Sequence, residues 1–392
     1  MGSTIGQSRV KQWSDELQLN YTSDFLTLTA GGIYFDIKTM NGAADGLPGT
    51  SGYFTNFIFG GVIPGGQRNF SRFHGKSTAG YAQVEVHITP QLDLIGGYRY
   101  TRDRKTGLSY VFKGSTAEQL TYTSSYRDNR STFALGANFR PTDDILLYAK
   151  YSTGFVSGGS VSSYVYDPET VKAWEGGIKA EFFDRRLRAN LAVFKADYKN
   201  IQAVVTGRNL RPVPDVDVGT LIIEEGDLDT HGFEAEFTAV PVEGLTLNVA
   251  AGYTDTKFTR INPAIRTSNV GSVRPKWTSN LSVQYDTQPM FGDAHMMFRL
   301  DAVYRSRTQQ LQDPISAPGG YAVQYSNALW LLNGRVALRD IDIGGSKAEL
   351  AVWGRNLTNS DVPGQPIDLQ VGIVSSSYIE ARTYGFDLTF QF

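Results

Sequence analysis

The 392-residue chain contains no cysteine, which excludes disulfides and thiolate metal sites and suits an oxidising compartment. No run of apolar residues approaches 18, so the sequence predicts no transmembrane helix. The formal net charge is −2, and without a basic excess to neutralise phosphates we expect no nucleic-acid partner. Charged residues form only 19% of the chain, below the roughly 25% of ordinary soluble domains.

Motifs for export and for catalysis are also missing. The opening MGSTIGQSRVKQWSDE has no apolar segment, so we expect no signal peptide. His74, His87, His231 and His295 show neither an i, i+4 pair nor HExxH spacing, which predicts no metal site. Without a G-x-S-x-G elbow or a phosphate loop, we expect no enzyme and no cofactor. An outer-membrane enzyme with a Ser–His pair at the rim is the least favoured alternative.

The C-terminal segment YGFDLTFQF alternates between large apolar and small or polar residues. Side chains of a strand point to opposite faces with period two, so this segment has one apolar face. A soluble sandwich would turn that face inward, and a membrane barrel would turn it toward lipid. The residues of the apolar face are Tyr384, Phe386, Leu388, Phe390 and Phe392.

The same alternation recurs along the chain, with short turns and long connections between successive segments. Turn residues such as Pro, Asp and Gly occupy the short turns at 23–24, 89–91, 140–144, 184–186, 241–244, 290–293 and 343–345. The long connections are predicted at 39–74, 107–129, 155–170, 202–220, 259–273, 307–325 and 358–376. This layout predicts an all-β fold: an antiparallel transmembrane β-barrel, partial, of about 15 strands, with short periplasmic turns and long extracellular loops.

Aromatic and charged residues agree with a barrel. Tyr and Trp gather in the strand halves near the long connections, and Phe near the short turns, as two interfacial belts would require. The first belt comprises Tyr98, Tyr100, Tyr148, Tyr151, Tyr253, Tyr304 and Trp353, and the second Phe139, Phe182, Phe183, Phe237 and Tyr285. The polar faces carry Glu234, Glu236, Arg299, Asp301, Arg335 and Arg339, which would line a lumen or a solvated sandwich face.

Several stretches resemble the barrel of TonB-dependent outer-membrane receptors. They are DDILLYAKYSTGFVSGG (143–159), the segment 167–202, HGFEAEFTAVPVEGLTLNVAAGYTDTKF (231–258), WGRNLTNS (353–360) and the terminal aromatic strand. The resemblance implies that the last strand closes the barrel and is the signal read by the barrel-assembly machinery. It further implies outer-membrane lipid as surroundings and a Gram-negative outer membrane as location.

Relatives of this kind carry a plug inside about 22 strands. We therefore expect residues 1–392 to be the C-terminal part of the barrel, without the plug and the first strands. The implied function is energised uptake of a scarce solute such as an iron chelate, cobalamin or an oligosaccharide. The energy-transducing periplasmic partner would act through the plug segment. A passive porin is the alternative.

Two of the long connections contain candidate ligand contacts. Aromatics of the Gly-rich loop 39–74 could grip a planar ligand, and Arg of the loop 307–325 and its approach could bind carboxylates or catecholates. Packing of the loop on itself, or plain solvation, is the alternative for each. The candidates are Tyr53, Phe54 and Phe57 in the first loop and Arg305, Arg307, Gln309 and Tyr321 in the second.

Overall fold

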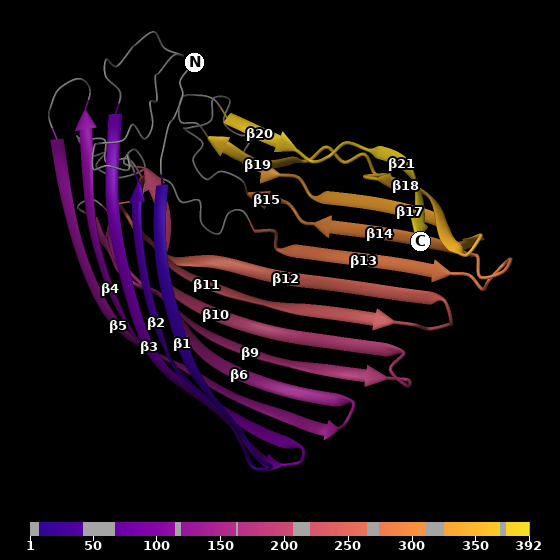
Figure 1. The fold of residues 1–392 in the computed structure, drawn as a ribbon, viewed down its shortest axis with the longest axis horizontal. Helices are drawn as coiled ribbons and strands as arrows, with labels where there is room; N and C mark the ends of the chain where they lie inside the picture. The colour runs from indigo at the N-terminus through magenta and orange to yellow at the C-terminus, as the bar shows by residue number, and fades with distance from the viewer. Residues whose placement is uncertain are drawn as a thin grey trace, which may run out of the picture.

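The structure is a computed structural model that describes residues 8–41, 67–113, 119–161, 164–206, 220–264, 274–309, 325–368 and 374–391. All regular elements of these segments are strands (Figure 1). None of the described segments forms a helix long and apolar enough to cross a membrane.

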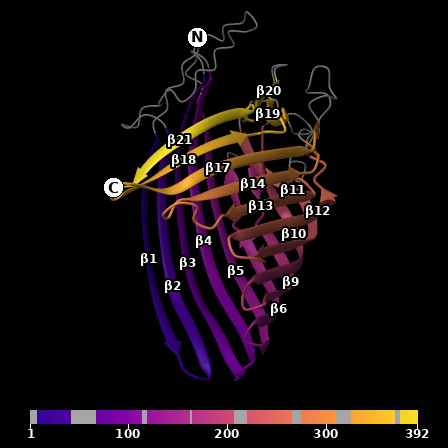
Figure 2. The same cartoon turned by 90° about the vertical axis from the view of Figure 1, so that its right-hand side faces the viewer.

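Fifteen strands form one antiparallel sheet in the order β1-β2-β3-β4-β5-β6-β9-β10-β11-β12-β13-β14-β17-β18-β21. Figure 2 shows this sheet curving from β1 around to β21. The predicted fold class and strand number are thereby confirmed. The strands are β1 (Ser8–Thr22), β2 (Leu26–Asn41), β3 (Gln67–Thr89), β4 (Leu92–Lys113), β5 (Gln119–Thr142), β6 (Ile145–Val156), β9 (Glu169–Phe182), β10 (Leu187–Thr206), β11 (Thr220–Ala239), β12 (Leu245–Ile261), β13 (Trp277–Asp286), β14 (His295–Arg305), β17 (Leu329–Ile343), β18 (Ser346–Arg355) and β21 (Thr383–Gln391).

The predicted short turns join neighbouring strands at one end of the sheet, here called the short-turn rim. Asp143 and Asp144 separate β5 from β6, and Gly344 and Gly345 separate β17 from β18. Both glycines have positive φ, 60° and 90°, which a two-residue hairpin turn requires and an L side chain resists.

The opposite end, the long-connection rim, differs from the prediction. The predicted connection 107–129 is wrong, because β4 continues to Lys113 and β5 begins at Gln119. The remaining predicted connections are also too long, since strands or small hairpins occupy part of each. Three such hairpins lie there: β7 (Gly159–Val161) with β8 (Tyr164–Tyr166), β15 (Thr308–Gln309) with β16 (Tyr325–Ser326), and β19 (Pro363–Asp368) with β20 (Val374–Tyr378).

The β7–β8 hairpin identifies the concave face of the sheet. It contacts β4 and β5 on one side and β11 on the other, although three strands of the sheet order separate β5 from β11. Only the inside of a curved sheet brings such strands within reach of one hairpin. Lys105 of β4 donates hydrogen bonds to the hairpin approach, so its side of β4 is concave. The strand register then assigns every other side chain to a face.

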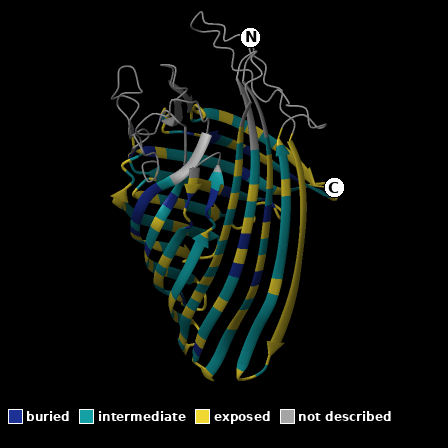
Figure 3. Ribbon diagram, turned by 90° about the vertical axis from the view of Figure 1, so that its left-hand side faces the viewer, coloured by how far each residue is buried: buried dark blue, intermediate teal, exposed yellow. Residues whose placement is uncertain are grey.

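The two faces differ in polarity. The concave face carries most charged groups of the strands, whereas the convex face is apolar and open except toward the long-connection rim. Convex side chains with large exposed fractions include Leu135 at 58%, Trp174 at 60%, Val193 at 62% and Val352 at 59%. Exposed and half-buried residues accordingly dominate the ribbon in Figure 3. A sheet with this convex surface requires an apolar solvent, which is the lipid side of a membrane barrel.

Aromatic pairs mark a girdle on the convex face toward the long-connection rim. Ring centroids lie 5.3 Å apart in Tyr98–Phe133, 4.5 Å in Tyr151–Trp174, 4.8 Å in Tyr253–Trp277 and 4.4 Å in Tyr304–Trp330. Two members of the predicted belt lie elsewhere. Tyr148 donates to Glu175 and Trp353 donates to Asp387, so both face the concave side because a polar partner lies there.

The C-terminal strand β21 pairs with β18 along its whole length, with Leu388 opposite Leu350. Its aromatic face is convex, as the alternation predicts, and Phe386 is 77% exposed. Phe392 lies outside the described residues. Within the described ranges, no backbone pairing joins β21 to β1, so the sheet is open between these two edges.

Candidate ligand-binding surface on the concave face

A polar hollow of about 510 Å³ lies on the concave face of the last five strands of the sheet. Its position follows from alternation, because all its lining residues except Gly334 and Gly354 lie opposite the lipid-facing apolar rows. We call it the arginine hollow. It is lined by Gln284, Met297, Arg299, Asp301, Asn333, Gly334, Arg335, Arg339, Trp353, Gly354, Arg355 and Asp387.

The arginine hollow is lined by paired arginines. Its lining includes four guanidinium groups and two carboxylates, and Glu349 and Asp286 pair with two of the arginines from outside the lining, so the formal charges balance. Arg335 donates to Asp387 of β21 and to Glu349 of β18, and Arg339 also donates to Glu349 at 3.0 Å. Because the arginines are held by carboxylates on neighbouring strands, their forks are oriented before any ligand arrives.

Trp353 supplies an apolar surface beside these charges. Its indole Nε1 donates to Asp387 at 3.0 Å, and the guanidinium carbon of Arg355 lies 5.0 Å from the ring centroid. The ring covers Gly385 of β21, where an added Cβ would lie 2.3 Å from a ring carbon. Gly385 therefore has no side chain because the indole occupies that space.

The β7–β8 hairpin forms a second feature of the concave face, near the long-connection rim. The Lys105 Nζ donates to the carbonyls of Ser157 at 3.2 Å and Gly158 at 2.7 Å. Lys105 lies seven residues beyond the girdle residue Tyr98 along β4. Burial lowers the pKa of the Lys105 amine. Gln202 donates to the carbonyl of Asp167 at 3.1 Å from the opposite side. These contacts hold the hairpin across the concave face and narrow that end.

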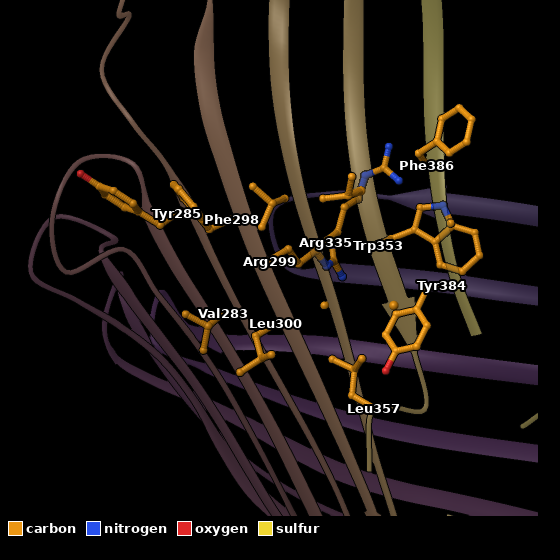
Figure 4. A pocket seen from close by; sticks show the side chains of 15 residues that line it. Val283, Tyr285, Phe298, Arg299, Leu300, Arg335, Trp353, Leu357, Tyr384 and Phe386 are labelled. Carbon is orange, nitrogen blue, oxygen red and sulfur yellow. The ribbon is translucent and has the colours of Figure 1, made fainter. Parts of the chain in front are cut away.

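An apolar hollow of about 820 Å³ lies behind the arginine hollow, on the convex face (Figure 4). Gly334 and Gly354 leave space in the apolar rows, and Leu357 covers both: Cβ atoms added there would lie 3.5 Å and 2.6 Å from its methyl groups. Figure 4 shows Val283, Leu300, Leu357 and Tyr384 around this space. The hollow continues the lipid-facing surface, so it offers no polar ligand site.

The WGRNLTNS stretch ends β18 with a buried asparagine. Asn356 has φ 49°, a conformation that asparagine tolerates better than most residues. Its side chain donates to the carbonyls of Ser360 at 2.8 Å and Glu380 at 3.0 Å and accepts from the Ser360 amide at 2.9 Å. Asn356 thereby joins the end of β18 to the approach of β21. These hydrogen bonds give a structural reason for an asparagine at this position of the WGRNLTNS stretch.

The structure describes only some of the residues predicted as loop contacts, and their binding role stays a prediction. Tyr53, Phe54, Phe57 and Tyr321 lie outside the described residues. Arg305 ends β14 and donates to the Ser326 hydroxyl at 3.4 Å, while Gln309 lies in β15 opposite Tyr325. Arg307 is exposed between these strands. None of these described residues lines the arginine hollow.

Alternation alone placed the charged residues of the arginine hollow on a polar face, and the structure confirms that Arg299, Asp301, Arg335 and Arg339 share the concave side. Trp353 and Asp387 were missed as site residues. The signal for them is the cross-strand register, which a single sequence does not display.

Comparisons with known proteins agree with this geometry. The model of the TonB dependent receptor-like β-barrel family matches residues 2–357. The probable TonB-dependent siderophore receptor PiuA of Acinetobacter baumannii is 24% identical over 205 residues, which are 49% of this chain and 25% of PiuA. The metal-pseudopaline receptor CntO of Pseudomonas aeruginosa is 28% identical over 167 residues, 42% of this chain and 22% of CntO.

Solved structures show the same fold. The ferric yersiniabactin uptake receptor FyuA of Yersinia pestis superposes with a TM-score of 0.72 at 15% identity, covering 99% of this chain and 55% of FyuA. The copper transporter OprC superposes with a TM-score of 0.65 at 13% identity, covering 99% of this chain and 58% of OprC. The chain thus spans about half the length of these solved proteins. With its curved antiparallel sheet, apolar convex face and matched family model, the chain belongs to the TonB-dependent receptor β-barrel family.

Proposed function

We propose that the chain forms part of the wall of an outer-membrane receptor that takes up an anionic metal chelate, such as an iron chelate, in a Gram-negative bacterium. The observation that carries the proposal is the arginine hollow, which gathers four guanidinium groups beside Trp353 on the concave face. Siderophore and metal-chelate receptors among the relatives support the same substrate class.

The arginine hollow suits such a ligand for two reasons. Guanidinium forks match carboxylate and catecholate oxygens in pairs, and the carboxylates on neighbouring strands hold these forks in place for an anionic ligand. The face of Trp353 adds an apolar contact for an aromatic or aliphatic part of the chelate. Energy coupling would come from a periplasmic partner and a plug, as in the family.

The test is a titration of the chain in detergent with ferric chelates of catecholate and carboxylate type, followed by tryptophan fluorescence. Trp13, Trp174, Trp277 and Trp330 lie on the convex face and are at least 44% exposed, so a ligand in the hollow should quench chiefly Trp353. We expect saturable quenching that the Trp353→Phe variant loses.

A matched pair of arginine variants tests the charge. Arg335→Gln should weaken binding at least tenfold, about 1.4 kcal/mol. Arg188→Gln should leave ligand binding unchanged. Arg188 also lies on the concave face and is ion-paired, to Glu181 at 2.7 Å, but it lies near the short-turn rim. Equal affinity in both variants, or no saturable quenching by any ferric chelate, would overturn the proposal.

Planar-bilayer conductance separates the receptor from a passive porin. A porin gives stable, uniform steps, and their appearance in the isolated chain would count against a receptor wall. We expect irregular or no conductance.

A further inference from the structure

Three metal-ligating side chains converge on the concave face near the short-turn rim, far from the long connections. Glu85 and His87 lie two residues apart on β3, and Asp93 of β4 pairs directly with His87 across the hairpin. One ligand atom of each residue lies within 4.8 Å of those of the other two. Asp93 is buried, and the other two are half-buried. The spacing of histidines along the sequence did not indicate this group, because Asp93 comes from the neighbouring strand.

The hydrogen bonds orient the group. The His87 Nδ1–H donates to Asp93 Oδ1 at 2.7 Å, while His87 Nε2 lies 3.2 Å from the Thr27 hydroxyl. Arg140 of β5 donates to the other oxygen of Asp93, Oδ2. The Arg140 contact holds the carboxylate so that Oδ1 remains directed at the imidazole, in the way outer partners fix metal ligands.

The charge of the group favours a cation. With neutral His87, the two carboxylates of Glu85 and Asp93 outweigh the guanidinium of Arg140, which leaves a formal charge of −1. One imidazole nitrogen with two carboxylate oxygens is a borderline ligand set, typical of first-row transition ions rather than of Mg²⁺ or Ca²⁺. Binding would displace the proton between Nδ1 and Oδ1.

We infer that Glu85, His87 and Asp93 form a binding site for a divalent first-row transition-metal ion such as Zn²⁺ on the lumenal wall. Three protein ligands leave at least one coordination position open toward the concave face. The site is independent of the proposed chelate binding, because it lies on β3 and β4 rather than on β13–β21.

Two other histidines of the chain provide contrasts. His74 lies 3.1 Å from Asp36, but Lys76 also binds this carboxylate at 3.6 Å. His295 lies 3.4 Å from Asp340 and 3.7 Å from Asp286, and Arg339 is 3.8 Å from Asp286. Neither histidine has three ligand atoms gathered within 4.8 Å among the described residues. His74 is therefore the matched control.

The experiment is calorimetric titration of the full chain in detergent with Zn²⁺, together with the visible absorption of Co²⁺. We expect one equivalent to bind to wild type, at least tenfold weaker binding to His87→Ala, and unchanged binding to His74→Ala. Glu85→Gln keeps the His87–Asp93 hydrogen bond and should also weaken binding, so loss of fold cannot mimic the result. Equal binding by wild type and His87→Ala, or no binding by wild type, would overturn the inference.

Discussion

The two rims of the sheet are built differently. At the short-turn rim, strands meet through compact turns, and apart from the Glu85–His87–Asp93 group most charged side chains there are exposed, such as Asp293, which binds Lys347 at 2.6 Å. At the long-connection rim, polar groups at the strand ends are buried. Asn356 is 4% exposed and Asp227 is 9% exposed.

The difference shows which interactions stabilise each rim. Exposed ion pairs contribute little, about 0–1 kcal/mol, so the short-turn rim depends on backbone pairing and turn conformation. Buried polar groups cost free energy unless they are paired, so the long-connection rim depends on specific side-chain-to-backbone hydrogen bonds. Substitutions of single polar residues should therefore act strongly at one rim and weakly at the other.

The largest expected effect is that of Asn356→Ala. The variant loses four side-chain hydrogen bonds and places alanine at positive φ, so the free energy of unfolding should fall by about 3 kcal/mol. Asp342→Ala is the counterpart at the other rim, where the exposed Asp342 accepts from the Gly345 amide at 3.2 Å, and should cost about 0.5 kcal/mol or less. Denaturant unfolding in detergent measures both. Equal losses would break the comparison.

The next largest effect is that of Lys105→Met, which keeps the aliphatic stem and removes the amine. The carbonyls of Ser157 and Gly158 lose that donor, at a cost of about 1–2 kcal/mol. The β7–β8 hairpin should open more often, and chymotrypsin should cleave at Tyr164 or Tyr166 about tenfold faster. The exposed Lys150→Met is the control on the same face. An unchanged cleavage rate would show that Lys105 does not hold the hairpin.

The smallest effect concerns pH. Asp227 lies six residues from Phe233, whose ring centroid is 6.0 Å from that of the girdle residue Tyr253. Hydrogen bonds from Arg260 lower the pKa of the Asp227 carboxyl to about 2. Because the folded pKa lies below the unfolded value of about 3.9, the stabilisation is complete above pH ~4 and disappears as the pH falls toward 2. Thermal unfolding between pH 2 and 6 should show this loss.

Asp227→Asn supplies the control for that measurement. The variant cannot titrate, so its melting temperature should change less than that of wild type across the same pH range. Parallel curves would show that the Asp227–Arg260 pair makes no pH-dependent contribution to stability.

Strand number, facing and turns were predictable from the sequence, because alternation and turn residues are local. How far each strand extends beyond the girdle was not predictable from the sequence. β4 and β5 extend beyond the girdle, and residues 101–107 and 121–131 carry mainly polar side chains on both faces of the strands. Without an apolar face, this part of a strand resembles a loop in sequence. The small hairpins were missed for the same reason.

The sequence by itself determined which side chains share a face of each strand, since period-two alternation is a property of the extended backbone. Only the tertiary structure decided which residues of different strands meet. Register places Arg335 beside Asp387, 52 residues away, and His87 beside Asp93 across a hairpin. Curvature of the sheet brings the β7–β8 hairpin against both β5 and β11. Both depend on pairing between distant segments, which local patterns do not encode.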